Sequence, residues 1–142
     1  MREIKFRAWD ERHEVMHHNV QFIKSGDTGA DWICFDSDEK PSKRNATGIL
    51  FDDPFFSQQI KLMQYTGLKD KNGREIYEGD ILSSEYPMKG NKNCHPVVWG
   101  SGRWNVDHSI NDCCRAWRGD LNGHHASEEV IGNIYENPEL LK

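Results

Sequence analysis

Hydrophobic and polar residues alternate with a period of two in several short stretches of this chain. The first stretch covers residues 2–9, and a polar segment at 10–14 separates it from a second apolar series between Val15 and Ile23. Alternation of this kind is typical of a strand with one buried and one solvent-facing side. The pattern therefore predicts that the chain opens with a β-hairpin.

The strongest turn signal lies in the middle of the chain. Strand-like runs at 63–68 and 74–77 flank a polar segment that ends in Asn72-Gly73. Because Asn and Gly tolerate positive φ, this pair between two strand-like runs predicts a second hairpin.

A third hairpin is predicted between residues 96 and 106. Its two apolar runs flank the glycine-containing turn 100–102, which places Trp99 and Trp104 near opposite one another. Cross-strand aromatic pairs stabilise a hairpin, and we expect this pair to seed the core.

Two single strands complete the regular pattern. A tight turn at 78–80 leads into a strand predicted over 81–86. A final strand is predicted over 129–135, ended by residues 136–138, and a closing helical turn follows at 139–141.

The remaining segments have weaker patterns. Residues 24–47 are polar apart from an apolar island at 32–35, which predicts a short strand, and residues 109–126 have no regular pattern. Asp53-Pro54 before several apolar residues is typical of a capped first helical turn, and a strand that begins near Ile60 is the alternative.

Short strands at brief intervals, few helices and no βαβ alternation predict a mostly β fold, namely a small open or closed barrel built from hairpins. The 142 residues fit one domain, with residues 24–60 as an alternative minor lobe. Aromatic residues make up 11% of the chain and include five Trp, so we expect a core built around large rings.

Charge and hydropathy narrow the range of partners. The formal net charge is −5, and no segment is strongly basic. The electrostatic attraction behind non-specific nucleic-acid binding is therefore weak unless folding gathers basic residues on one face, so nucleic acid is an alternative partner. No stretch approaches the roughly 18 apolar residues of a membrane span and no signal peptide is present, so we expect a cytoplasmic protein without a membrane partner.

Cysteine and histidine residues offer a metal site only through long-range combinations. The four cysteines show no framework spacing, and a reducing compartment keeps them as thiols. There is no Cys-x-x-Cys pair or His-Glu-x-x-His helix, so we expect no cofactor and no metal. A zinc-stabilised interaction module is the alternative, and its candidate ligands are Cys94, His95, Cys113, Cys114, His124 and His125, or His13 with His17 or His18.

Catalytic motifs are absent from the sequence. Paired carboxylates such as Asp52-Asp53 are neighbours in the chain, and neighbours on a strand point to opposite faces. No nucleophile elbow, P-loop or Gly-x-Gly-x-x-Gly is present. We therefore expect a protein that acts by binding, with no catalytic residues.

The five tryptophans allow a further alternative, a stacking platform for single-stranded nucleic acid. Such platforms come with a positive groove, and the acidic total argues against one. We therefore interpret Trp9 and Trp117 as candidate core, interface or stacking residues.

Four segments together resemble the YopX family of phage and prophage proteins. They are residues 2–10, residues 63–82 (MQYTGLKDKNGREIYEGDIL), Val97-Val98-Trp99 and residues 129–141 (EVIGNIYENPELL). The resemblance spans both ends of the chain and weakens in residues 24–60 and 87–126. It implies an SH3-type β-barrel or roll, a phage or prophage origin and self-association, and it brings no catalytic or binding residues.

Residues within these segments have expected structural roles. Edge strands of the N-terminal hairpin and of residues 132–135 are expected to pair between subunits, with Ile134 and Tyr135 at the interface. The expected partners are a second copy of the chain and a phage or host protein. The residues expected to form turns or other backbone motifs are Gly67, Asp70, Asn72, Gly73, Gly79, Asp80, Gly132, Asn133 and Pro138.

Overall fold

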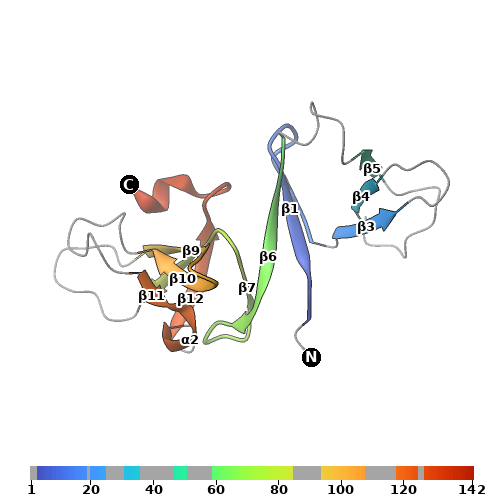
Figure 1. Ribbon diagram of the computed structural model, residues 1–142. Helices are drawn as coiled ribbons and strands as arrows, with labels where there is room; N and C mark the ends of the chain where they lie inside the picture. Colours follow the sequence, from blue (N-terminus) through green and yellow to red (C-terminus); the bar gives the residue numbers. More distant parts are fainter. Residues whose placement is uncertain are drawn as a thin grey trace. The chain divides into compact units, whose positions relative to one another are not determined.

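A computed structural model describes residues 3–18, 20–24, 31–35, 47–50, 59–84, 94–107, 118–124 and 127–142 (Figure 1). The predicted mostly β, barrel-like fold is confirmed, since short, curled antiparallel sheets make up most of this part of the chain. The elements are β1 (Phe6–Asp10), β2 (Val15–His17), β3 (Val20–Lys24), β4 (Asp31–Phe35), β5 (Thr47–Leu50), β6 (Ile60–Lys69), β7 (Glu75–Tyr77), β8 (Asp80–Ser84), β9 (Cys94–Gly100), β10 (Arg103–Asp107), β11 (Arg118–Asp120), α2 (Leu121–His124), β12 (Glu128–Asn133) and the 3₁₀ helix η1 (Pro138–Leu141).

The chain divides into two compact units, which we describe separately. The N-terminal unit is Lys5–Gln64, and the C-terminal unit is Tyr65–Lys142 together with Met1–Ile4. Assignment of residues 1–142 to one domain stays a prediction.

In the N-terminal unit, β1 lies between β2 and the first half of β6. The predicted opening hairpin is confirmed, but its returning strand is split. The residues of β2 pair with β1, whereas β3 pairs with β4 in a separate sheet of order β3-β4-β5. Ala8 and Ile60 form a small core, and Val20 and Leu62 pack against it.

Two further predictions concern this unit. The strand expected at 32–35 is confirmed as β4, which pairs with β3 and β5. The alternative of a strand beginning near Ile60 is confirmed, because β6 starts there. The first helical turn predicted after Asp53-Pro54 lies outside the described residues.

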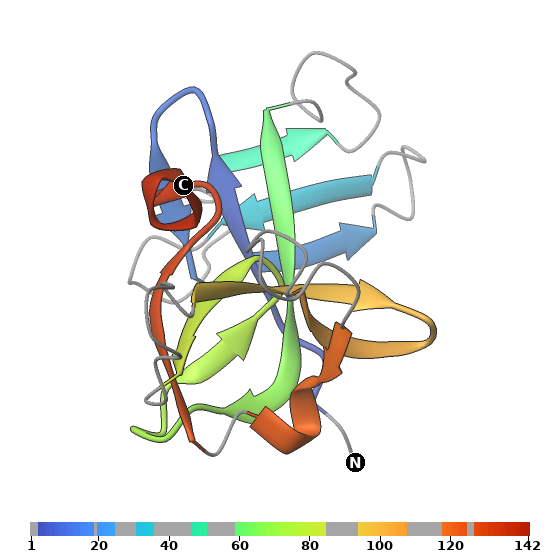
Figure 2. The same ribbon diagram turned by 90° about the vertical axis from the view of Figure 1, so that its left-hand side faces the viewer.

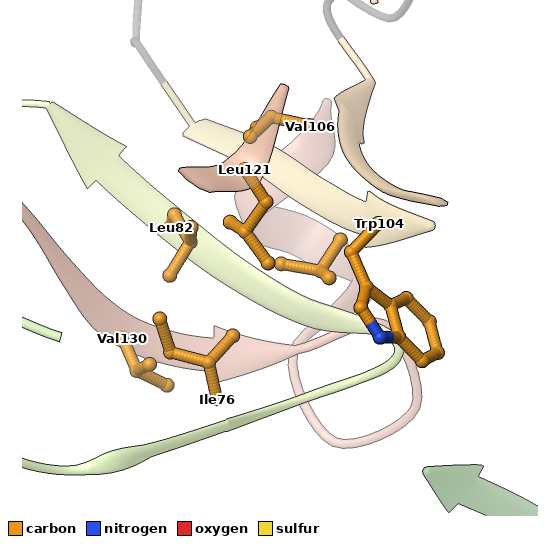
Figure 3. Packing of buried hydrophobic residues seen from close by; sticks show 7 residues of the cluster. Ile76, Leu82, Trp104, Val106, Leu121 and Val130 are labelled. Carbon is orange, nitrogen blue, oxygen red and sulfur yellow. The ribbon is translucent and has the colours of Figure 1, made fainter. Parts of the chain in front are cut away.

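The C-terminal unit contains a five-stranded antiparallel sheet of order β11-β10-β9-β8-β12. Residues from four of these strands, together with Ile76 and Leu121, form the main hydrophobic core (Figure 3). Leu68 packs against this cluster from β6. The members of the cluster are Ile76, Leu82, Val97, Trp104, Val106, Leu121 and Val130.

The hairpin predicted around Asn72-Gly73 is confirmed as β6 and β7. Its turn is closed by a hydrogen bond from the Gly73 N–H to the Asp70 carbonyl (2.9 Å), with Gly73 at φ +83°. The Asp70 carboxylate accepts backbone N–H groups from Asn72 (2.9 Å), Arg74 (2.8 Å) and Val130 (3.0 Å). Asp70 thus orders its own turn and ties that turn to β12.

Two more contacts join this turn to β12. The Lys71 N–H donates to the Glu128 carbonyl (3.0 Å), and the Arg74 guanidinium donates to the Val130 carbonyl (3.2 Å). Hydrogen bonds to the β6–β7 turn therefore already cover the edge of β12 that faces away from β8, at residues 128–130.

The predicted last strand and closing helical turn are confirmed as β12 and η1. Asn137 packs so close to the Gly132 backbone that a Cβ at Gly132 would lie 2.5 Å from its side-chain Oδ1. Asn133 orders the chain after β12, because its Oδ1 accepts the N–H groups of Tyr135 (3.0 Å) and Glu136 (2.9 Å) and its amide donates to the Glu136 carboxylate.

Residues 109–126, which have no regular pattern in the sequence, contain β11 and α2. The interpretation of this whole segment as irregular was therefore wrong. Both elements are too short to show a period, and tertiary contacts hold them, since β11 pairs with β10 and Leu121 is fully buried in the main core.

Candidate functional site

A groove with a volume of about 420 Å³ lies within the C-terminal unit. We call it the tryptophan groove. Its lining residues belong to a bulge in β6, the tip of the β9–β10 hairpin and α2. Figure 2 shows the ribbons of these elements. Its lining residues are Thr66, Gly67, Leu68, Trp99, Gly102, Arg103, Trp104 and Asn122.

The hairpin tip is a two-residue turn between the paired residues Gly100 and Arg103. Ser101 and Gly102 have φ values of +54° and +75°, and positive φ at both central residues is the mark of a type I′ turn. The buried Asn105 amide braces the turn by donating to the carbonyls of Gly100 (2.8 Å) and Arg103 (3.0 Å). The braced turn thereby fixes the backbone of the neighbouring groove residues Trp99, Arg103 and Trp104.

Trp99 and Trp104 are directly opposite across the hairpin, as predicted. Their rings meet edge to face, with centroids 4.8 Å apart and planes inclined at 68°. Only Trp104 belongs to the core, with 6% of its surface exposed, at the margin of the aliphatic cluster in Figure 3. Trp99 is 51% exposed, so its expected place in the core was wrong.

Position along the hairpin does not distinguish the two rings, because directly opposite residues lie equally near the turn. The rings differ in their contacts, since the core cluster includes Trp104 and not Trp99. Trp104 therefore covers the core, and Trp99 extends the aromatic surface into the groove.

The opposite wall of the groove is a bulge in β6. Tyr65 pairs with Tyr77 and Lys69 pairs with Glu75, so three residues of β6 oppose a single residue of β7. The Thr66 hydroxyl donates to the Ile76 carbonyl (2.8 Å) and accepts the Leu68 N–H (3.2 Å), while Gly67 has φ +86°. Bulges redirect side chains and are common beside functional sites.

Polar groups line the rim of the groove. Asp120 Oδ1 accepts the backbone N–H of Asn122 (3.0 Å) and its side-chain amide (3.1 Å). Asp120 Oδ2 also lies 3.8 Å from Arg103 Nη1, and both side chains are largely exposed. Asp120 thus positions two groove residues and balances the charge of Arg103.

Comparison with known proteins identifies the chain. The pattern of the YopX protein family matches residues 5–142. The chain belongs to the YopX family. No curated protein matches this YopX family member.

Two solved structures resemble this YopX family member over its full length. Protein EF1440 from Enterococcus faecalis is 32% identical, with a TM-score of 0.65 and complete coverage of both chains. Protein yopX from Bacillus subtilis is 22% identical, with a TM-score of 0.59 over all of this chain and 98% of the other. The second likeness concerns the fold alone.

None of the described candidate interface and stacking residues lines the tryptophan groove. Trp9 is buried on β1 of the N-terminal unit, opposite Met16 and Lys61. Ile134 follows β12 and donates its N–H to the Gly79 carbonyl (2.9 Å), and Tyr135 is half-buried beside it. Trp117 lies outside the described residues.

The expected turn residues occupy turns or tight backbone contacts. Gly79 has φ +77°. Its N–H donates to the Val97 carbonyl (2.8 Å) and its carbonyl accepts the Ile134 N–H, so Gly79 links its own turn to two other segments. The buried Asp80 carboxylate accepts the Tyr77 N–H (2.8 Å), and Pro138 opens η1. Asp70 and Asp80 therefore act as acceptors for backbone N–H groups.

Within the described residues, no three His, Cys, Asp or Glu side chains gather in a way that fits a metal ion. His95 is buried on β9 and Cys94 is a half-buried thiol. Cys113, Cys114 and His125 lie outside the described residues, as do the side chains of Cys34 and His124. No described helix is long and apolar enough to cross a membrane.

Sequence reasoning missed much of the groove. Arg103, Asn122 and the bulge at 66–68 come together only through tertiary structure. The usable signal was local, since Gly100-Ser101-Gly102 between two tryptophans marks a tight turn that brings large rings to a hairpin tip.

Proposed function

We propose that this YopX family member acts by binding a phage or host protein through the tryptophan groove, and that it is a prophage-encoded, cytoplasmic protein without enzymatic activity. The observation that carries the proposal is the half-exposed Trp99, held edge-on against the buried Trp104. Trp and Arg are the residues most enriched at the energetic centres of protein interfaces, and this groove places Trp99 beside Arg103.

The preorganisation of Trp99 also supports a binding function. The type I′ turn, the Asn105 amide and the contact between the two rings all restrict Trp99 before any partner arrives. A partner then gains the burial of a large ring while little conformational entropy is lost.

The polar chemistry of the groove favours binding over catalysis. The Thr66 hydroxyl is engaged with the backbone of Ile76 and Leu68, and Asp120 is engaged with Asn122 and Arg103. Nucleophilic catalysis needs a nucleophile beside a base, and the groove's described residues do not provide that pair.

Charge favours a protein partner over nucleic acid. Arg103 is balanced by Asp120, and the whole chain has a formal charge of −5. A site for single-stranded nucleic acid combines stacking rings with a positive groove, and only the rings are found here.

Self-association is the second part of the proposal, through the edge of the N-terminal hairpin. β2 is the outermost strand of its sheet, and Val15 on it is 45% exposed. The other edge expected to pair, residues 132–135, is a weaker candidate because Ile134 already donates its N–H within the chain.

Selection of peptides from a random display library tests the groove. Wild-type protein should select a defined set of peptides, and the Trp99→Ala variant should lose them while keeping its melting temperature within a few degrees. The matched control is Ile4→Ala, at an exposed apolar residue outside the groove and outside the proposed β2 interface, which should select the same peptides as wild type. A failure of wild-type protein to select any peptide, or selection that Trp99→Ala leaves intact, would overturn the proposal.

Native mass spectrometry of untagged protein tests self-association. We expect a closed oligomer for wild type and a monomer for Val15→Lys, since a lysine on an edge strand opposes edge-to-edge pairing. A wild-type monomer, or an oligomer that Val15→Lys does not weaken, would refute an interface at β2.

A further inference from the structure

The tryptophan groove presents hydrogen-bond donors in excess of acceptors. Trp99 contributes an indole N–H, which is a donor only, and Arg103 contributes five N–H groups and no acceptor. The Asn122 amide donates one N–H to Asp120 and has a second N–H and a carbonyl oxygen, which is an acceptor. The Thr66 hydroxyl and the Asp120 carboxylate already bond to groups of their own chain, so side-chain donors still outnumber side-chain acceptors in the lining.

A ligand that complements this set supplies more acceptors than donors. A peptide rich in proline does so, because proline has no backbone N–H and keeps its carbonyl. In the polyproline II conformation these carbonyls make no internal hydrogen bonds and point outward.

The apolar part of the groove suits the same ligand. The half-exposed ring of Trp99 and the Leu68 side chain both line the groove and offer apolar surface to a proline ring. Gly102 on the rim leaves open space, as a Cβ placed there would meet no atom within 4 Å. A ligand backbone can therefore approach the hairpin tip closely.

We propose that the tryptophan groove recognises an extended, proline-rich peptide segment in the polyproline II conformation. The inference rests on the proposed protein-binding function of this groove and names the chemical class of its partner. Trp99 packs against a proline ring, and Arg103 and Asn122 donate to ligand carbonyls. Asp120 is a positioning residue, since it holds both donors from outside the groove lining.

The charge balance of the rim sharpens the choice of ligand. The pairing of Arg103 with Asp120 leaves the rim near neutral, which suits a ligand of carbonyls and apolar rings. A phosphate backbone would gain little there, because nucleic-acid affinity depends on clustered positive charge.

Isothermal titration of the full chain with capped synthetic peptides tests the inference. The probes are a short proline-rich peptide, a glycine-serine peptide of equal length and single-stranded oligothymidine. We expect saturable binding of the proline-rich peptide alone, weakened about tenfold or more by Trp99→Ala. The matched control is Ile4→Ala, at an exposed apolar residue outside both the groove lining and the proposed β2 interface, and it should bind like wild type.

Two additional variants keep the result interpretable. Trp99→Phe retains a ring on Trp104 but removes the indole N–H, so it should bind more weakly than wild type even if Trp99→Ala fails to fold. Asp120→Asn should also weaken binding, because Arg103 loses the charge that holds it. Equal binding of both peptides, or full binding by Trp99→Phe and Trp99→Ala, would overturn the inference.

The remaining outcomes separate this inference from the proposed function. Display selection of Trp99-dependent peptides that lack proline would leave the protein-binding function standing and refute the polyproline ligand. Salt-sensitive binding of oligothymidine at Trp99 would refute both, as would the absence of any Trp99-dependent ligand.

Discussion

The β6–β7 and β9–β10 hairpins of the C-terminal unit differ in what their turns do. At the first, Asp70 accepts three backbone N–H groups, and Lys71 and Arg74 bond to β12. At the second, Asn105 closes the turn from below, while Trp99 and Arg103 face solvent. One turn is hydrogen-bonded within its own chain, and the other presents exposed side chains to a partner.

This difference teaches where to look for function in a small β protein. Both turns have a clear local sequence signal, and both are well ordered by side-chain hydrogen bonds. The two turns differ in how many of their polar groups are already hydrogen-bonded within the chain. Tertiary contacts decide that number. Four predictions test the contrast.

Replacing the two tryptophans one at a time should give the largest contrast. Trp104→Ala should lower the free energy of unfolding by about 3–5 kcal/mol, since it removes a buried ring from the core. Trp99→Ala should cost about 1 kcal/mol, mainly from the lost edge-to-face contact. Urea unfolding followed by far-UV circular dichroism measures both.

Equal losses for the two variants would contradict the assignment of Trp104 to the core and Trp99 to the surface. Trp104→Phe provides a control that keeps a ring at the site, and it should lose less than Trp104→Ala. Ligand binding by Trp104→Phe should be retained only if the new ring still holds Trp99 in place, as Trp104 does.

Asp70 should matter more to stability than any residue of the groove apart from Trp104. Asp70→Ala leaves the buried Val130 N–H without its acceptor and should cost about 2–3 kcal/mol. Asp70→Asn keeps one oxygen and should cost less. A change below about 0.5 kcal/mol in Asp70→Ala would show that the turn does not depend on this carboxylate.

Asp70 should also make the stability of the protein depend on pH. Burial on its own would raise the pKa of Asp70, but the N–H groups of Val130, Arg74 and Asn72 outweigh it and lower the pKa below the ordinary value of 3.8. A lowered pKa in the folded state contributes stability that is present above about pH 4 and is lost as the pH falls further. Asp70→Asn should therefore flatten the loss of stability below about pH 4 in urea titrations at a series of pH values.

Most of the strands could be predicted from the sequence because their signals are local. The turn at Asn72-Gly73, the turn at 100–102 and the apolar island at 32–35 each needed only a few neighbouring residues. Segments that depend on distant partners were misread. β11 has three residues and is defined by its pairing with β10, and the returning N-terminal strand splits because β3 has its own partner in β4.

The groove was harder to predict for the same physical reason. The register predicted that Trp99 and Trp104 would be opposite one another, but burial depends on where the core ends. Nothing local in Asn122 or in residues 66–68 indicates that they would form its other walls. The bulge in β6 arises from pairing with β7, and the place of α2 arises from burial of Leu121.

The smallest expected effect concerns the turn that presents the groove. Ser101 has φ +54°, a conformation that Asn and Gly adopt with less strain than Ser, and Asn-Gly is the preferred pair in a type I′ turn. Ser101→Asn should therefore raise the free energy of unfolding by about 0.5 kcal/mol, whereas Ser101→Val should lower it by about 1 kcal/mol or more because a β-branched residue resists positive φ. Thermal melts measure both variants. Since Ser101 lies outside the groove lining, Ser101→Asn should leave ligand affinity unchanged or slightly higher, and a loss of stability in Ser101→Asn would mean that this tip is not a type I′ turn in solution.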